Sequence, residues 1–205
     1  MQKVTLLLAV LLTVLPFAAA ATSQQDADDD AHDWALRHYG RVLDAVLPIE
    51  ARLDVVRRDL KWGVRLLVTP AFEAEGAYTL LMAFDGGVTA SVTTLSGGSV
   101  LTQLKGLYPQ QKNVSAGELP ALIKRSTREF TGQQCPALKR AAQAFEQLRI
   151  PASLAGALQM DSTGYQLVSE GRSGTLRLSI NAPDPAPVVE WAERVRKSVA
   201  GCAAR

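Results

Sequence analysis

The chain has 205 residues, of which 47% are hydrophobic and 20% are charged, and its formal net charge at pH 7 is +2. This length suits a single domain with a sizeable core, because a domain of about this size buries roughly 70% of the surface of its unfolded chain. A near-neutral chain without a pattern of interleaved basic and aromatic residues is a poor candidate for nucleic-acid binding, so we expect no nucleic-acid partner.

The first 20 residues have the order of a secretory signal peptide. Lys3 gives a basic start, residues 4–17 are apolar apart from two threonines, and residues 18–20 are the small alanines that a signal peptidase needs. The apolar run is shorter than the ~20 residues that span a bilayer, although a retained transmembrane helix is the alternative. We therefore expect cleavage near Ala20, export to the periplasm or out of the cell, and no membrane-spanning segment in the mature protein.

Residues 21–30 are polar and acidic, which predicts a disordered lead. A single α+β domain is expected over residues 31–205. Its first element is an amphipathic helix, because apolar residues from Ala35 to Val46 recur at helical spacing before Pro48 ends the pattern.

Residues 51–95 change from a helical period to the alternation that is typical of β-strands. We expect four strands, at residues 53–58, 62–68, 78–84 and 88–95. The sequence Asp85-Gly86-Gly87 predicts a tight hairpin between the last two, because glycine tolerates the positive φ of such turns. The four strands should form an antiparallel meander.

Three helical segments are expected after the meander, at residues 100–107, 115–130 and 136–150. Pro109 should stop the first, and Ser115 with Glu118 fits a capping box that opens the second. Pro136 suits the first position of the third helix, where its missing N–H costs little.

The chain should end with a second hairpin, a break and a helix. Residues 165–180 alternate around a turn at residues 171–174, a proline-rich break follows, and residues 188–202 carry one apolar stripe. Strands and helices thus occur in separate runs. This favours an antiparallel α+β fold, in which a four-strand meander and a second hairpin pack against about four helices.

Cys135 and Cys202 are the two cysteines of the chain. In an oxidising compartment, an even count most simply predicts one disulfide, and Cys202 lies on the apolar stripe of the last helix. Closing a loop of this length stabilises the fold by about 4 kcal/mol in the loop-entropy model. Two free thiols are the alternative, but the cysteines lack the C-x-x-C spacing of a redox motif.

No known catalytic or cofactor motif is present in the sequence. It lacks a G-x-S-x-G elbow, an S-x-x-K or H-E-x-x-H motif, a G-x-G-x-x-G turn and a P-loop. His32 and His38 are six positions apart, which does not place them on one face of a helix as a metal pair requires. We therefore expect no enzyme, cofactor or metal site, although two dispersed carboxylates, as in glycosidases, would leave no motif.

The densest basic run surrounds Trp62 and includes Arg57 and Arg58. Tryptophan and arginine are enriched where proteins bind each other, so Arg57, Arg58, Trp62 and the hairpin residue Asp85 are candidate partner-binding residues. The alternative is an edge strand protected by charge, with Trp62 inside the core.

Together these features favour a non-enzymatic protein of the cell envelope that acts by binding another protein. An inhibitor or immunity protein that guards against a toxic or lytic enzyme would fit this profile. One alternative is a periplasmic carrier of a lipid or solute, or an assembly accessory, since some strands are apolar on both faces. A second alternative is a hydrolase with dispersed carboxylates.

Overall fold

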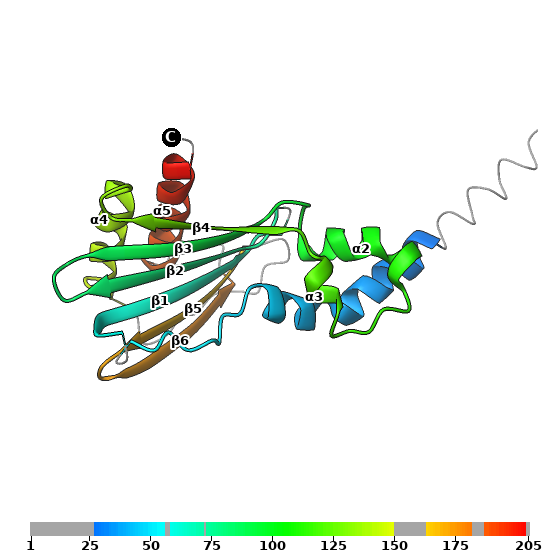
Figure 1. Cartoon of the computed structure of the whole chain (residues 1–205), viewed down its shortest axis with the longest axis horizontal. Helices are drawn as coiled ribbons and strands as arrows, with labels where there is room; N and C mark the ends of the chain where they lie inside the picture. The colour runs from blue at the N-terminus through cyan, green and yellow to red at the C-terminus, as the bar shows by residue number, and fades with distance from the viewer. Residues whose placement is uncertain (1–26, 56–57, 72, 150–162, 182–186, 204–205) are drawn as a thin grey trace, which may run out of the picture.

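A computed structural model describes residues 27–55, 58–71, 73–149, 163–181 and 187–203. Six strands form one antiparallel sheet in the order β4-β3-β2-β1-β5-β6 (Figure 1). They are β1 (Leu60–Thr69), β2 (Gly76–Ala83), β3 (Val88–Leu95), β4 (Arg125–Thr131), β5 (Gly164–Gly171) and β6 (Gly174–Asn181). The predicted antiparallel α+β class is therefore confirmed.

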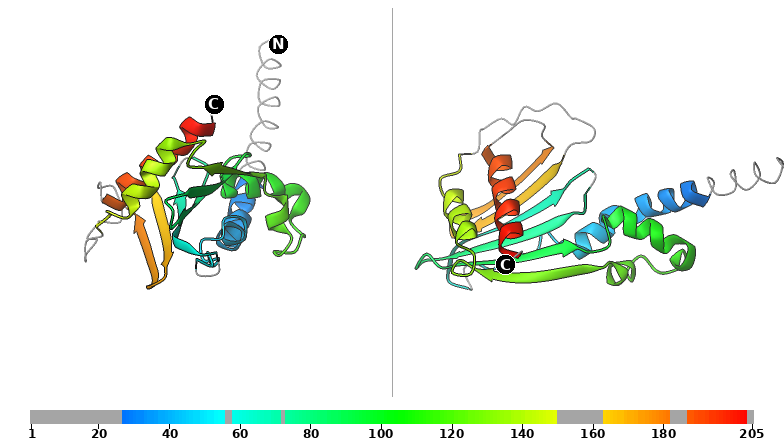
Figure 2. Two further views of the ribbon diagram at one scale, coloured as in Figure 1. Left: turned by 60° about the vertical axis from the view of Figure 1, so that its left-hand side comes forward. Right: turned by 90° about the horizontal axis from the view of Figure 1, so that it is seen from above.

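The helices in the described part of the chain form two groups. A helix over residues 27–46 lies beside α2 (Val100–Gln111) and α3 (Leu119–Leu122) at one end of the sheet and extends beyond it. Helices α4 (Pro136–Phe145) and α5 (Pro187–Ala203) lie together on one face (Figure 2). The molecule is consequently elongated, with a helical part beyond one end of its sheet.

The larger core lies between the sheet and the pair α4 and α5. Alternate residues of β1, from Trp62 to Val68, point into it together with Leu80 of β2 and Leu167 of β5. The stripe of α5 covers them, with Trp191 and Val195 buried. This stripe was predicted from the helical spacing, and the structure confirms it.

A second core lies on the opposite face, where the helical group meets the sheet. Leu67, Leu95 and Val168 come from three strands and share one buried cluster with Val46 of the N-terminal helix and Leu104 of α2. Because the two helical groups cover opposite faces at different places, part of the second face carries no helix.

The predicted disulfide is confirmed. Cys135 is the residue before α4, Cys202 lies in the last turn of α5, and their Cα atoms are 5.7 Å apart. The hairpin at Asp85 is also confirmed: Gly86 has a φ of +81°, and Asp85 Oδ1 accepts a hydrogen bond from the Gly87 N–H at 2.8 Å.

The strand predicted at residues 53–58 is wrong in its described part. Asp54 and Asp59 both have a φ of +51°, which interrupts an extended conformation. Leu53 and Val55 are nevertheless buried, because the segment crosses the second face of the sheet and packs on it. Alternating burial here reflects packing over a sheet and not pairing within one.

The helix predicted at residues 115–130 is also wrong. It is limited to α3, after which residues 125–131 form β4 and pair with β3 along their whole length. Glu118 Oε2 accepts a hydrogen bond from the Ser115 N–H at 3.2 Å, so half of the expected capping box exists. The helical spacing predicted Phe130 and Leu119 on one face of a single helix, but pairing with β3 determines the conformation of residues 125–131 instead.

Three helix boundaries differ from the expected ones. Helix α4 ends at Phe145, before the expected end at residue 150. The N-terminal helix includes residues 28–30, which were predicted to belong to the disordered lead, and acidic residues in a first turn are favoured by the helix dipole. Helix α2 continues through Pro109 to Gln111. At that exposed end of the helix, the missing N–H removes only one late backbone hydrogen bond.

Candidate functional site

The uncovered part of the second face carries a row of polar side chains. Strand register places Arg65, Thr79, Ser91 and Glu129 side by side across β1, β2, β3 and β4. Residues that are opposite each other in neighbouring antiparallel strands point to the same face. The row is therefore a property of the sheet itself and does not depend on loops.

These side chains line a hollow of about 650 Å³, which we call the groove. Its walls include Arg58, Arg65, Thr79, Thr89, Ser91 and Glu129. A second hollow of about 500 Å³ shares Leu81, Thr89 and Thr131 with it and extends to the Asp85 hairpin. The two hollows adjoin at these shared residues over β2, β3 and β4, and we call them together the channel. Its lining combines hydroxyl groups with charged groups of both signs and with apolar side chains such as Leu60, Leu81 and Phe130.

Arg65 forms the inner end of the groove. Its Nε donates to Thr79 Oγ1 at 3.3 Å, and its Nη1 donates to the carbonyl oxygens of Pro48, at 3.0 Å, and of Ala51. Burial lowers the pKa of this guanidinium, against a raising effect from Glu170. Arg65 thus fixes the chain that leaves the N-terminal helix against the sheet.

The described residues just before β1, among them Leu53, Val55 and Arg58, lie beside the groove, which Arg58 lines. The Leu53 N–H lies 3.2 Å from both carboxylate oxygens of Glu170 on β5. Gly63 lies beneath these residues, and a Cβ atom there would be 3.0 Å from side-chain carbons of both Leu53 and Leu81. Glycine at this position of β1 lets these residues approach the sheet closely, which holds them in place.

Trp62, a candidate partner-binding residue, lies in the larger core on the face opposite the groove. Its side chain is 8% exposed, and its ring centroid is 5.0 Å from that of Phe145 on α4. Its Nε1 donates to Glu146 Oε1 at 2.9 Å, an atom that also pairs with Lys61 Nζ at 2.7 Å. The structure therefore does not display Trp62 beside Arg58.

The other candidates have different positions. Arg58 is exposed and lines the groove, and Asp85 lines the hairpin end of the channel. Arg57 lies outside the described residues. The structure thus brings Arg58 and Asp85 to one surface and leaves Trp62 on another.

The sequence did not point to Glu129 and Thr131 as site residues, since β4 was assigned to a helix. The signal that could have found them is the run Arg-Ser-Thr-Arg-Glu-Phe-Thr at residues 125–131, in which Thr127, Phe130 and Thr131 are residue types enriched in strands. A sequence of this composition has low helix propensity and suits a polar strand at the edge of a sheet.

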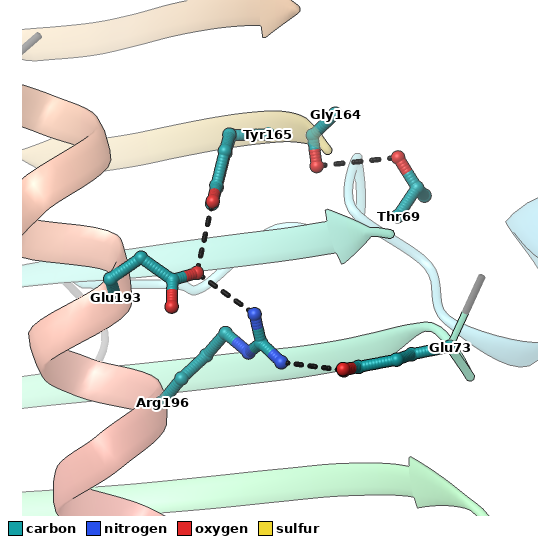
Figure 3. Close-up of polar contacts among 6 residues, drawn as sticks. All are labelled: Thr69, Glu73, Gly164, Tyr165, Glu193 and Arg196. Carbon is teal, nitrogen blue, oxygen red and sulfur yellow. Dashed lines mark hydrogen bonds and ion pairs between the residues drawn. The ribbon is translucent and has the colours of Figure 1, made fainter. Parts of the chain in front are cut away.

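A second polar cluster lies on the face covered by α5 (Figure 3). Glu193 Oε1 accepts from Tyr165 Oη and from Arg196 Nη1, both at 2.9 Å, and Arg196 Nη2 is 3.0 Å from Glu73 Oε2. Burial, followed by the hydrogen bond to Glu193, raises the pKa of Tyr165 to about 12. These contacts connect α5 to β5 and to the loop before β2, so we assign the cluster to holding the helix on the sheet.

Two further observations concern the described residues alone. None of their helices is both long enough and apolar enough to cross a membrane. Among them, no three histidine, cysteine, aspartate or glutamate side chains are grouped closely enough to hold a metal ion.

Comparison with known proteins identifies no relative from which a function could be transferred: no protein-family model matches the chain, and no curated protein matches it. Function is therefore argued from the groove.

Proposed function

We propose that this protein is exported to the cell envelope and acts there by binding another protein through the groove. The observation that supports the proposal is the uncovered row of side chains across β1 to β4, on the face of the sheet opposite the larger core. A rigid sheet presents its side chains with little loss of conformational freedom on binding, which favours affinity.

The character of the groove favours a protein surface over a small apolar ligand. Pockets for small molecules are mostly apolar and enclosed. This channel instead combines hydroxyl groups with Arg58 and Glu129, and it is open along its length. It resembles the polar and charged surroundings that protein interfaces present to a partner. Within this class, an inhibitor or immunity protein against a toxic or lytic enzyme is the specific role that we propose.

The alternatives make different demands on the structure. A carrier for a lipid would need an enclosed apolar cavity, whereas this channel is open and places Arg58, Arg65, Glu129 and Asp85 among its apolar residues. A hydrolase would need two carboxylates held near a bound substrate, and Glu129 and Asp85 are the carboxylates that line the channel. Both alternatives stay predictions from the sequence.

The test compares two arginine substitutions on the same strand. Thr89 is exposed on β3 in the groove, so Thr89→Arg should fill the channel without disturbing the core. Thr94 is exposed on the same strand but points to the opposite face, so Thr94→Arg is the matched control. Wild-type protein and both variants are used to capture partners from envelope extracts of the native cells.

We expect the wild type and Thr94→Arg to retain the same protein at similar yield, and Thr89→Arg to retain at least ~10-fold less, since a bulky charge at the centre of an interface commonly costs 2 kcal/mol or more. Equal retention by both variants would remove the groove from the proposal.

N-terminal sequencing of the protein from the same extracts tests export. A chain that begins near Ala21 is expected, and an intact Met1 form confined to the cytoplasm would refute export.

A further inference from the structure

The outer edge of β4 has free hydrogen-bonding groups, and their positions follow from the register. Gly132 N donates to Val88 O at 2.8 Å at one end of the strand, and Ser96 N donates to Lys124 O at 3.0 Å at the other. In an antiparallel pair, every second residue exchanges both hydrogen bonds with its neighbour. The backbone N–H and C=O groups of the even-numbered residues from 124 to 132 therefore point toward β3. The same groups of the odd-numbered residues point outward, away from the sheet.

The side chain of Gln134 closes one end of this edge. Gln134 Oε1 accepts from the Thr131 N–H at 3.0 Å, and the Thr131 carbonyl accepts from Cys135 N at 2.9 Å. At the other end, the Lys124 N–H donates to Gln103 Oε1 at 2.7 Å on the side of β3, so it is not part of the outer edge. Between Lys124 and Thr131, the outward backbone groups of Arg125, Thr127 and Glu129 have no partner among the described residues. We call these three residues the free edge.

The free edge is accessible and carries more positive than negative charge. All residues from Arg125 to Glu129 are exposed. Lys124, Arg125 and Arg128 are basic along this stretch, against the single acid Glu129. Charge of this kind prevents pairing with ordinary apolar strands, and it favours a strand that brings acidic side chains.

We propose that a partner protein binds by adding an extended, acidic segment to the free edge as a seventh strand. This inference rests on the proposed function and specifies how the partner enters the groove, because Thr127 and Glu129 also point toward the uncovered face. Three outward residues offer up to six backbone hydrogen bonds, which give affinity. Alternate side chains of the added segment would lie beside Glu129 on one face and beside Arg128 on the other, which gives specificity.

The opposite edge of the sheet is a less suitable place. Strand β6 is remote from the groove, which lies over β2 to β4, and its one basic residue, Arg177, already pairs with Glu50 at 2.8 Å. Strand β6 therefore supplies a control for the experiment.

The experiment selects peptides from a displayed library of random 12-residue sequences on the full exported protein. Selected peptides are synthesised, and their affinities are measured by fluorescence anisotropy. The principal variant is Thr127→Pro, because proline at an outward position of an edge strand removes the free N–H while leaving the pairing with β3 intact. Thr127→Val is its matched control, since it keeps the N–H and loses only the hydroxyl that lies 2.9 Å from that of Thr93.

Three more variants keep the test decisive. Glu129→Pro removes another outward N–H. It is used in place of Thr127→Pro if thermal unfolding shows that Thr127→Pro does not fold. Ser179→Pro places proline on β6 and should not change binding. Arg128→Ala tests the charge preference, and it should weaken acidic peptides several-fold and reduce the dependence of their affinity on salt.

We expect the selected peptides to be rich in acidic and β-branched residues. Their affinity should fall at least ~10-fold in Thr127→Pro or Glu129→Pro, and should change less than ~3-fold in Thr127→Val and Ser179→Pro. Peptides that bind all variants equally, or a failure to enrich any acidic sequence, would overturn strand addition. A dimer of this chain that Thr127→Pro abolishes in sedimentation experiments would also overturn it, by making a second copy the occupant. None of these results decides the groove proposal, which the capture by Thr89→Arg tests separately.

Discussion

At the scale of single residues, Trp62 shows how burial decides the role of an aromatic side chain. Its ring packs on Phe145, and its indole N–H is satisfied by Glu146. The hydrogen bond from Lys61, and after it the one from Trp62, lowers the pKa of the Glu146 carboxyl. Trp62 therefore contributes to the attachment of α4 to the sheet, and Arg58 has to be judged separately from it.

We expect Trp62→Ala to lower the free energy of unfolding by ~3–5 kcal/mol, because a large cavity would remain in the core. Trp62→Phe keeps an aromatic contact with Phe145 and should cost less, about 1–2 kcal/mol. Lys61→Ala removes the exposed partner of the same carboxylate and should cost under ~1 kcal/mol. Urea unfolding of the three variants measures these differences. An unchanged midpoint for Trp62→Ala would contradict the buried position.

The tyrosine cluster under α5 predicts a specific dependence of stability on alkaline pH. The pKa of Tyr165 is raised to about 12, so the folded state favours the neutral phenol. An unfolded tyrosine loses its proton near pH 10, and stability should therefore fall as the pH rises from about 10 through about 12. Tyr165→Phe should be less stable near neutral pH but should show a shallower fall over that window. Denaturant unfolding at several alkaline pH values compares the two slopes, and equal slopes would refute the assignment.

At the scale of elements, the spacing of apolar residues predicted those strands and helices that bury one face and expose the other. Strands β2 and β3 alternate around a glycine turn, and α5 carries one continuous apolar stripe. Strand β4 was missed because its residues are exposed and polar apart from the half-buried Phe130, so hydrophobic alternation gives almost no signal for it. At residues 53–55, in contrast, a strand was predicted where there is a loop, because a loop that packs over a sheet can bury alternate apolar side chains as a strand does.

The disulfide connects the start of α4 to the end of α5, and we expect it to stabilise the pair. Replacing Cys135 and Cys202 by serine should lower the free energy of unfolding by up to about 4 kcal/mol, which is the value for closing a loop of this length. Urea unfolding of the double variant tests this expectation, with chemically reduced wild-type protein as the comparison. Thiol alkylation of native wild-type protein without reductant should label neither cysteine, and labelling of both would contradict the bond.

At the scale of the whole molecule, the groove exists because two groups of helices cover different regions of one sheet. Helices α4 and α5 cover one face, and the N-terminal helix with α2 and α3 covers one end of the other. The sequence could not predict which part of the sheet the helices would leave open. That outcome depends on the packing of residues such as Leu47 and Leu67 in one core, and these are 20 positions apart and leave no local pattern.

The most direct test of the central claim is cross-linking in living cells. A photo-reactive amino acid is placed at position 89, inside the groove, and separately at position 94 on the same strand and the opposite face. After irradiation, the products are separated by mass and identified. The groove proposal predicts a covalent adduct with one second protein from position 89 and little or none from position 94. Adducts in equal amount from both positions, or from position 94 alone, would contradict it.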